Sequence, residues 1–500
     1  MRTLTATVMS AAAIGALLLV PALSQAAPAP TPGPAAIPQG RGYDQADKFI
    51  GHPAVAHPVT LPKVSNNPYM SPNGTSNIHN DTWMTDAYPG DGPLGRNTQV
   101  TSVNALGECA SITFDSLGRL VAVCINPKGS FLTMMHPDSL RIIAREKLPA
   151  GPETDSSGDY TEVAGAYFYL DNRNRAVVAT ADHHLTYYAY SLTPGDRGFN
   201  VVKEIDITSA MDTTDSIQSA LPDFSGNVWF ATKSGVVGNV NPKTEVVKWI
   251  NLPGEIISNS FAMDKDGGVY IVSTAALYRF DAGSDGTPVT TWRAVYDNTG
   301  GEPKPSQKSA GSGTTPTVMS GGRVAIVDNA NPENVVVYRT APNASNRKIC
   351  QAPVFGKDAS ATENSLVAIG DSLIAENNFG YKVIADTTKG KTSTPGMARV
   401  DVTAAGECVN VWTNNKVTAP SVVPKFSAKT GLVYTYTKPA GPGTIDRWYW
   451  TALDYRTGRI VYSVLTGTGV FFNNSYASLY LSPSGVGYAG VIGGVVRIEG

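Results

Sequence analysis

The stretch "SITFDSLGRLVAVC" (residues 111–124) contains the unit from which the fold can be predicted. A short apolar run leads into the turn residues "DSLG", and a second run rich in apolar and β-branched residues follows. Short buried or alternating runs on both sides of turn residues are typical of two antiparallel strands joined as a hairpin. The stretch therefore predicts a β-hairpin.

The same pattern recurs along the chain. We count eight instances, and the other seven lie at 166–180, 219–232, 260–273, 315–328, 365–377, 422–436 and 478–491. Most of them are followed by a second hairpin, as at 235–252, 276–295 and 448–465. Four antiparallel strands per unit, repeated every roughly 40–60 residues, indicate a β-propeller.

The two ends of the repeat region predict how the ring closes. The last unit, "SLYLSPSGVGYAGVIGGVVRIEG" (478–500), has room for only three strands. The missing outer strand is available in "NTQVTSVNAL" (97–106), and pairing the two ends removes an open sheet edge. We predict an all-β, single eight-bladed propeller over 97–500. Seven blades would result if the weak second unit (166–180) were an insertion.

Three stretches resemble known propeller groups. "TALDYRTGRIVYSV" (451–464) resembles the repeat of pyrroloquinoline-quinone-type propellers, and "GNVWFATKSGVVGNVNPKTEVVKWINLPG" (226–254) resembles blades of the streptogramin-lyase group. "SNSFAMDKDGGVYIVS" (258–273) resembles the gluconolactonase group. The resemblance is to a quinoprotein-like and gluconolactonase-like superfamily. It implies the fold from about residue 100 to 500 and selects no function, because propellers host many.

The four cysteines fit an oxidising compartment. In a hairpin closed at "DSLG", Cys109 and Cys124 face each other at a spacing that a disulfide can bridge. Cys350 and Cys408 then remain, and their pairing follows only by elimination. Buried free thiols are the alternative for all four.

The N-terminus predicts export. Arg2 supplies a positive charge, "AAAIGALLLVPAL" (11–23) is an apolar run too short to span a bilayer, and "SQA" (24–26) has the small residues of a cleavage site. We predict a signal peptide over 1–26, a secreted protein (extracellular or periplasmic), and no membrane span. The net charge of −2 gives no electrostatic footprint for nucleic acid.

Residues 27–96 precede the ring. The first part, "APAPTPGPAAIPQGRG" (27–42), is typical of an extended Pro-rich spacer, and the rest is expected to pack on the propeller as an irregular extension. Its last stretch, "SNIHNDTWMTDAYPGDGPLG" (76–95), is tethered near the channel mouth by the closing strand. We therefore consider His79 and Asp81 as catalytic candidates. The alternative is that they only cap this stretch.

The first residues of the inner strands ring one face of a propeller, and several of them are polar here. Glu162, Asn259, Glu363 and Asn364 place oxygen atoms at these positions. In the gluconolactonase and paraoxonase relatives, Glu, Asn and Asp at such positions bind the catalytic metal. The resemblance implies a Ca²⁺ site, since Ca²⁺ takes six to eight oxygen ligands. The alternative is a wet channel mouth, where polar residues cost nothing.

One further histidine is a catalytic candidate, and one cofactor motif is absent from the sequence. His183, in "TADHHLTYYAY" (180–190), would be a general base if it lay near a carboxylate, and otherwise a satisfied turn histidine. The quinone-dependent alcohol dehydrogenases carry two adjacent cysteines against the cofactor. This chain has no such pair, so a pyrroloquinoline-quinone (PQQ) cofactor is not expected, although the soluble glucose-dehydrogenase type lacks the pair too.

Aromatic clusters suggest what the protein binds. "DRWYW" (446–450) and "TYYAY" (186–190) suit carbohydrate or peptide ligands, with packing between blades as the alternative. Our first hypothesis is an exported, monomeric propeller that binds a small molecule, carbohydrate or peptide at the channel mouth. The second is a calcium-dependent, lactonase-like hydrolase or lyase at the same place. A quinoprotein dehydrogenase is the third, and whether the protein is an enzyme stays open.

Overall fold

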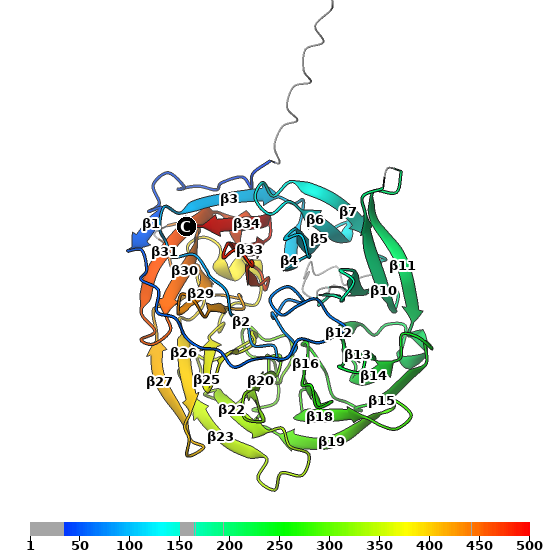
Figure 1. Cartoon of the computed structure of the whole chain (residues 1–500). Helices are drawn as coiled ribbons and strands as arrows, with labels where there is room; N and C mark the ends of the chain where they lie inside the picture. The colour runs from blue at the N-terminus through cyan, green and yellow to red at the C-terminus, as the bar shows by residue number, and fades with distance from the viewer. Residues whose placement is uncertain (1–34, 151–164, 166, 194, 442) are drawn as a thin grey trace, which may run out of the picture. The chain divides into compact units, whose positions relative to one another are not determined.

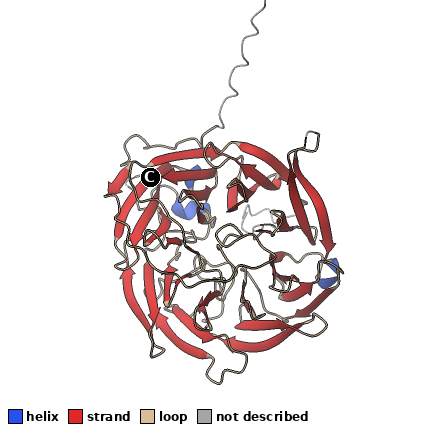
Figure 2. Ribbon diagram, in the orientation of Figure 1, coloured by secondary structure: helices blue, strands red, loops and turns tan. Residues whose placement is uncertain are grey.

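The computed structural model describes residues 35–150, 165, 167–193, 195–441 and 443–500. The predicted signal peptide and Glu162 lie outside the described residues. Within the described ranges the strands form eight sheets, which stand as blades around a central channel (Figure 1, Figure 2). The predicted eight-bladed, all-β propeller is confirmed. The seven-bladed alternative is wrong, because the weak second unit forms a complete four-stranded blade.

The first four blades follow the chain from the channel to the rim. Blade 1 contains β4 (Glu108–Phe114), β5 (Leu120–Asn126), β6 (Gly129–Met135) and β7 (Ile142–Lys147). Blade 2 contains β8 (Tyr169–Leu170), β9 (Ala176–Ala179), β10 (His184–Ser191) and β11 (Gly198–Asp206). Blade 3 contains β12 (Ile217–Pro222), β13 (Val228–Thr232), β14 (Val236–Val240) and β15 (Val247–Asn251). Blade 4 contains β16 (Ala262–Met263), β17 (Val269–Val272), β18 (Ala276–Ala282) and β19 (Pro288–Val295).

The other four blades complete the ring. Blade 5 contains β20 (Thr317–Met319), β21 (Arg323–Val327), β22 (Asn334–Arg339) and β23 (Lys348–Pro353). Blade 6 contains β24 (Val367–Ile369), β25 (Ser372–Glu376), β26 (Met397–Val402) and β27 (Cys408–Asn414). Blade 7 contains β28 (Lys425–Ser427), β29 (Leu432–Thr437), β30 (Arg447–Asp454) and β31 (Ile460–Thr468). Blade 8 contains β32 (Leu479–Leu481), β33 (Gly487–Val491), β34 (Gly494–Glu499) and β3 (Gln99–Asn104).

Three short 3-10 helices lie in the described connections: η2 (Thr208–Ala210), η3 (Ile384–Thr387) and η4 (Val470–Phe472). In this part of the chain no helix has the length and apolar character needed to cross a membrane.

An aspartate opens the first turn of each of the first four blades. One carboxylate oxygen of Asp115 accepts hydrogen bonds from the backbone N–H groups of Leu117 (2.9 Å) and Arg119 (2.8 Å). Asp171, Asp223 and Asp264 repeat the same two bonds at the same spacing. Such side-chain bonds to the following backbone stabilise a tight turn. The turn residues of the sequence repeat therefore fix each hairpin locally.

The closing strand joins the two ends of the ring as predicted. β3 pairs antiparallel with β34 along its whole length, from Gln99 opposite Glu499 to Asn104 opposite Gly494. The N-terminal extension adds two more strands to blade 7. β2 (Ala87–Tyr88) pairs parallel to the inner strand β28, and β1 (Phe49–Gly51) pairs antiparallel to the outer strand β31.

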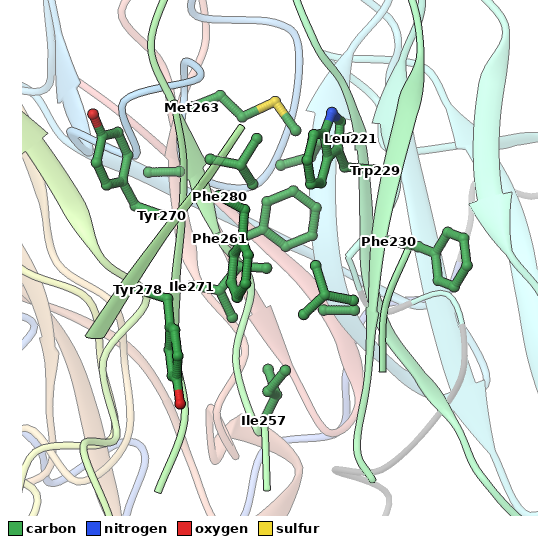
Figure 3. Packing of buried hydrophobic residues seen from close by; sticks show 14 of the residues in the cluster. Leu221, Trp229, Phe230, Ile257, Phe261, Met263, Tyr270, Ile271, Tyr278 and Phe280 are labelled. Atoms are coloured by element: carbon green, nitrogen blue, oxygen red, sulfur yellow. The ribbon is translucent and has the colours of Figure 1, made fainter. Parts of the chain in front are cut away.

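The core lies between neighbouring blades. In Figure 3 the side chains of Leu221 and Trp229 from blade 3 and Met263 from blade 4 lie between the two sheets. The predicted aromatic clusters contribute to the same kind of packing. Trp448 and Trp450 on β30 and Tyr187 and Tyr188 on β10 are buried in the core. Of the two interpretations of these aromatic clusters, packing between blades is therefore the correct one.

Both disulfides are present. Cys109 and Cys124 are directly opposite on β4 and β5, with their Cα atoms 3.9 Å apart. Cys350 on β23 and Cys408 on β27 join the outer strands of blades 5 and 6. The predicted pairing is therefore confirmed, and the second bridge is an inter-blade link.

Candidate functional site

The stretch Ser76–Gly90 crosses the channel, and we call it the plug. In Figure 1 it is part of the dark blue segment that carries β2 through the middle of the ring. Its backbone carbonyls accept hydrogen bonds from inner-strand N–H groups of five blades. These bonds run from Leu170 to Ser76 (2.8 Å), Met263 to Thr82 (2.7 Å), Val318 to Trp83 (2.9 Å), Ala368 to Thr85 (2.8 Å), Phe426 to Asp86 (3.0 Å) and Ala428 to Tyr88 (2.8 Å).

The plug satisfies a need of the propeller. The inner strand of each blade has one edge without a neighbouring strand, and buried backbone groups without partners are costly. Figure 1 shows β4, β12, β16 and β20 at the inner ends of their blades, facing the channel. Apart from the two-residue strand β2, the plug supplies these acceptors from irregular backbone, which explains why its sequence has no strand period.

His79 lies in the plug and belongs to a buried charged cluster. Its Nδ1 lies 3.0 Å from a carboxylate oxygen of Asp86, and the Lys425 ammonium pairs with the other oxygen of that carboxylate. Lys425 also donates to the carbonyl of Ile78 at 3.0 Å. All three charged or titratable side chains of the cluster are buried. The Nε2 atom of His79 has no hydrogen-bond partner among the described residues.

Asp81 has a different place from His79. It accepts hydrogen bonds from the backbone N–H of Trp83 (2.9 Å) and from the Thr85 hydroxyl (2.6 Å), so it holds the turn of the plug together. Burial raises the pKa of Asp81 to about 7. Asp81 lines a groove of about 520 Å³ between the plug and the segment 58–66. The structure therefore does not bring Asp81 to the same site as His79.

A cavity of about 90 Å³ lies at the channel mouth, above the plug. Its wall contains His79, Asn259, Lys308, Glu363, Asn364 and Tyr476. Four of the residues that sequence reasoning chose thus meet in one place, because the inner strands of the blades begin there. Glu108 and Ile125 of blade 1 close one side of the same cavity.

Glu363 lies four residues before β24 and is 8% exposed. One carboxylate oxygen accepts a hydrogen bond from the backbone N–H of Lys308 at 3.4 Å, and the other, Oε2, finds no partner within the described chain. Burial raises the pKa of Glu363 to about 8, although the nearby Lys308 opposes this shift. At neutral pH the side chain is therefore mostly a neutral carboxylic acid.

The Asn364 side chain, in the wall of the cavity, is held by hydrogen bonds to its neighbours. Its amide nitrogen donates to the carbonyl of Val422 (2.7 Å), to Asn378 (3.1 Å) and to Glu376 (3.3 Å). Burial raises the pKa of Glu376 well above its ordinary value, against the hydrogen bond that Thr435 donates to it at 2.7 Å. Asn364 therefore supports the cavity as part of a buried polar network, which sequence reasoning did not predict.

Tyr476 completes the cavity in a strained backbone conformation. Ser475 and Tyr476 have φ values of 43° and 65°, in the left-handed region that non-glycine residues seldom adopt. The Tyr476 hydroxyl donates to the carbonyl of Ser306 at 2.8 Å, and its ring lies 5.3 Å from that of Tyr381. Backbone strain of this kind is concentrated at functional sites.

The remaining candidates do not join the cavity. His183 is buried at the turn between β9 and β10, where its Nε2 lies 3.0 Å from the carbonyl of Asp215. Glu162 is not described. Across the described ranges, no group of three or more His, Cys, Asp or Glu side chains is arranged to hold a metal ion. Within these ranges the calcium prediction therefore has no carboxylate cluster to support it.

Comparison with known proteins adds similarity without a function. No family model matches the sequence. A curated protein of Archaeoglobus fulgidus, described as "Uncharacterized protein", is 28% identical over 394 residues, which cover 71% of this chain and 72% of that protein. Among solved structures, BamB from Moraxella catarrhalis (TM-score 0.44, 12% identity) covers 76% of this chain and 90% of its own. Streptogramin B lyase (TM-score 0.39, 10% identity) covers 80% of this chain and 97% of its own. Structural similarity this weak carries no argument about function.

Proposed function

We propose that the protein binds a small polar ligand in the channel-mouth cavity, between His79 and Glu363. One observation carries this proposal: two residues in the wall of one cavity, His79 and Glu363, each have a buried polar atom, Nε2 and Oε2, without a partner among the described residues. Each such atom costs about 1–3 kcal/mol when it stays unpaired. A ligand that pairs with both atoms recovers this cost.

The protonation of the two groups defines the ligand. Because the Asp86 carboxylate accepts from Nδ1–H, the tautomer of His79 that pairs with it has its lone pair on Nε2 and accepts a hydrogen bond there. Glu363, with its pKa raised to about 8, is protonated at neutral pH and donates. The ligand must therefore offer a donor to His79 and an acceptor to Glu363, as primary amides, carboxylic acids and hydroxycarbonyl compounds do.

Export is part of the proposal. The two disulfides support an oxidising compartment, and the predicted signal sequence supports secretion. The ligand is then a molecule of the cell exterior or periplasm.

Titration calorimetry with acetamide, glycolamide, glucose and glycylglycine tests the proposal and separates small amides from carbohydrates and peptides. We expect the amides to bind, His79→Phe and Glu363→Met to weaken binding at least tenfold, and Glu363→Gln to keep it, since its amide still donates. The exposed His52→Phe serves as the matched control. Equal affinities for His79→Phe and the control would contradict the proposal.

Acid–base catalysis is the second candidate. An imidazole oriented by a carboxylate, in the same cavity as a neutral carboxylic acid, resembles a base and an acid set for proton transfer in a hydrolase or lyase. Glu363→Gln separates this role from binding, because glutamine donates a hydrogen bond but cannot give up a proton. Turnover that disappears in Glu363→Gln, with ligand affinity retained, would support catalysis. Turnover retained in Glu363→Gln would exclude Glu363 as the acid.

Calcium stays a prediction and has a direct check. Thermal denaturation is measured with EDTA and then with CaCl₂ in excess. A structural or catalytic Ca²⁺ raises the melting temperature in a concentration-dependent way, because a ligand of the native state stabilises it. Identical melting curves would contradict the calcium site.

A further inference from the structure

A second pocket of about 270 Å³ adjoins the channel-mouth cavity over blades 8 and 1. The two spaces share Glu108 and Ile125 as wall residues, so they are neighbours. The second pocket is lined by the apolar side chains of Leu106, Phe471 and Ile384, which we call the apolar shelf.

Two side chains of the apolar shelf are largely exposed to solvent. Leu106 is 67% exposed and Phe471 is 48% exposed. Leu106 also has a left-handed backbone (φ 57°), held by a hydrogen bond from its N–H to the Asn104 side chain at 2.9 Å. A leucine at such a position is both strained and exposed, and glycine or asparagine would suit the turn better. Packing within the propeller does not explain this choice of residue.

The channel-mouth cavity is too small to hold a typical ligand alone, and the adjoining pocket is larger. The channel-mouth cavity, at about 90 Å³, is smaller than the roughly 300–1,000 Å³ typical of ligand pockets. It has room for the polar group between His79 and Glu363 and for little else. The rest of a larger ligand would have to continue into the adjoining pocket, where the wall is apolar.

We propose that the ligand is amphiphilic: a polar head with a donor and an acceptor enters the channel-mouth cavity, and an attached aliphatic chain lies on the apolar shelf. This inference rests on the proposed function of the cavity. We assign the shelf to the aliphatic chain of the same ligand, and not to a separate partner, because the two pockets share the wall residues Glu108 and Ile125.

A homologous series of primary amides tests the inference: acetamide, butanamide, hexanamide and octanamide, each titrated by calorimetry. The head is constant and offers both a donor and an acceptor, so only the chain varies. We expect affinity to rise about two- to fourfold per methylene, since a fully buried methylene corresponds to about a fourfold gain. Leu106→Asn and Phe471→Asn should flatten this dependence while leaving acetamide affinity unchanged.

The matched control is Leu117→Asn, the same substitution at a leucine that is 70% exposed in the turn after β4, at the end of that strand away from Glu108. It should keep the full chain-length dependence. Amides that bind with equal affinity at every length would overturn the amphiphile inference and leave the proposed function standing. Absence of binding by every amide would overturn both. A chain-length dependence that Leu106→Asn and Phe471→Asn do not change would overturn the assignment to the shelf.

Discussion

A single ion pair, between Asp86 and Lys425, connects the plug to blade 7. They are separated by 339 positions in the sequence, and both side chains are 0% exposed. Burial lowers the pKa of Lys425, and the adjacent Asp86 carboxylate opposes that shift. Neither charge has water to solvate it, so each depends on the other.

Lys425→Met tests this dependence. The variant leaves Asp86 with His79 as its remaining side-chain partner, and we expect the free energy of unfolding to fall by about 3–5 kcal/mol. Guanidinium denaturation measures the loss. The double variant Lys425→Met/Asp86→Leu, which buries no charge at this position, should recover part of the stability. A loss below about 1 kcal/mol in the single variant would show that the pair is not buried as described.

The raised carboxyl pKa values predict how stability depends on pH. Burial raises the pKa of Glu363 to about 8 and that of Glu333 to about 7, from 4.5. Between pH of about 4.5 and about 8 the folded state binds more protons than the unfolded state. The free energy of unfolding therefore falls as the pH rises through this range. Denaturation midpoints across this range measure the fall. Glu363→Gln should reduce it, whereas Asp371→Asn, a side chain 65% exposed, should not. Equal pH dependence in all three proteins would contradict the protonated Glu363.

Among the elements, the plug depends on a single side chain, because Asp81 holds its turn. We expect Asp81→Ala to raise hydrogen exchange at the amides of Met263, Val318 and Ala368, whose acceptors are plug carbonyls. The amide of Ile271, within blade 4, should keep its protection. Asp81→Asn retains an acceptor and should restore most of the protection. Unchanged exchange at Met263 in Asp81→Ala would show that Asp81 does not order the plug.

The two disulfides link strands, and removing each should lower the free energy of unfolding by a different amount. Cys350–Cys408 closes a sequence separation of 58 residues between two blades, and Cys109–Cys124 closes 15 within one hairpin. By loop-closure entropy, replacing the first pair with alanine should cost about 4 kcal/mol and replacing the second about 3 kcal/mol. Denaturation of the two double variants measures the difference. A larger loss from the Cys109–Cys124 pair would contradict this ranking.

Sequence reasoning found the elements because their causes are local. The turn residues of "DSLG" and its repeats fix each hairpin within about four residues, as the Asp115 bonds show. It also placed Asn259 and Glu363 at the channel mouth, because topology alone puts the starts of inner strands there. Lys425, the partner of Asp86, could not be predicted in this way. The bond between Asp86 and Lys425 joins segments with no common periodicity, and only the folded chain brings them together.

In the whole molecule, segments from both ends of the described chain complete the propeller. Pairing of β3 with β34 closes the ring in blade 8, and the preceding stretch supplies the plug that fills its centre. Ring closure could be predicted from the count of strands in the last unit. The path of the extension through the channel could not be predicted from the sequence. The plug forms its bonds one at a time with five separate blades.

Nitrogen NMR of the six histidine rings shows whether His79 Nε2 receives the ligand. The protein is labelled with ¹⁵N-histidine and titrated with octanamide, with His79→Phe used to assign the His79 signals. We expect Nδ1 of His79 to carry the proton and Nε2 the lone pair, and the Nε2 signal alone to shift as the amide donates to it. A protonated Nε2 in the free protein, or His79 signals that stay unchanged at saturating octanamide, would contradict this expectation.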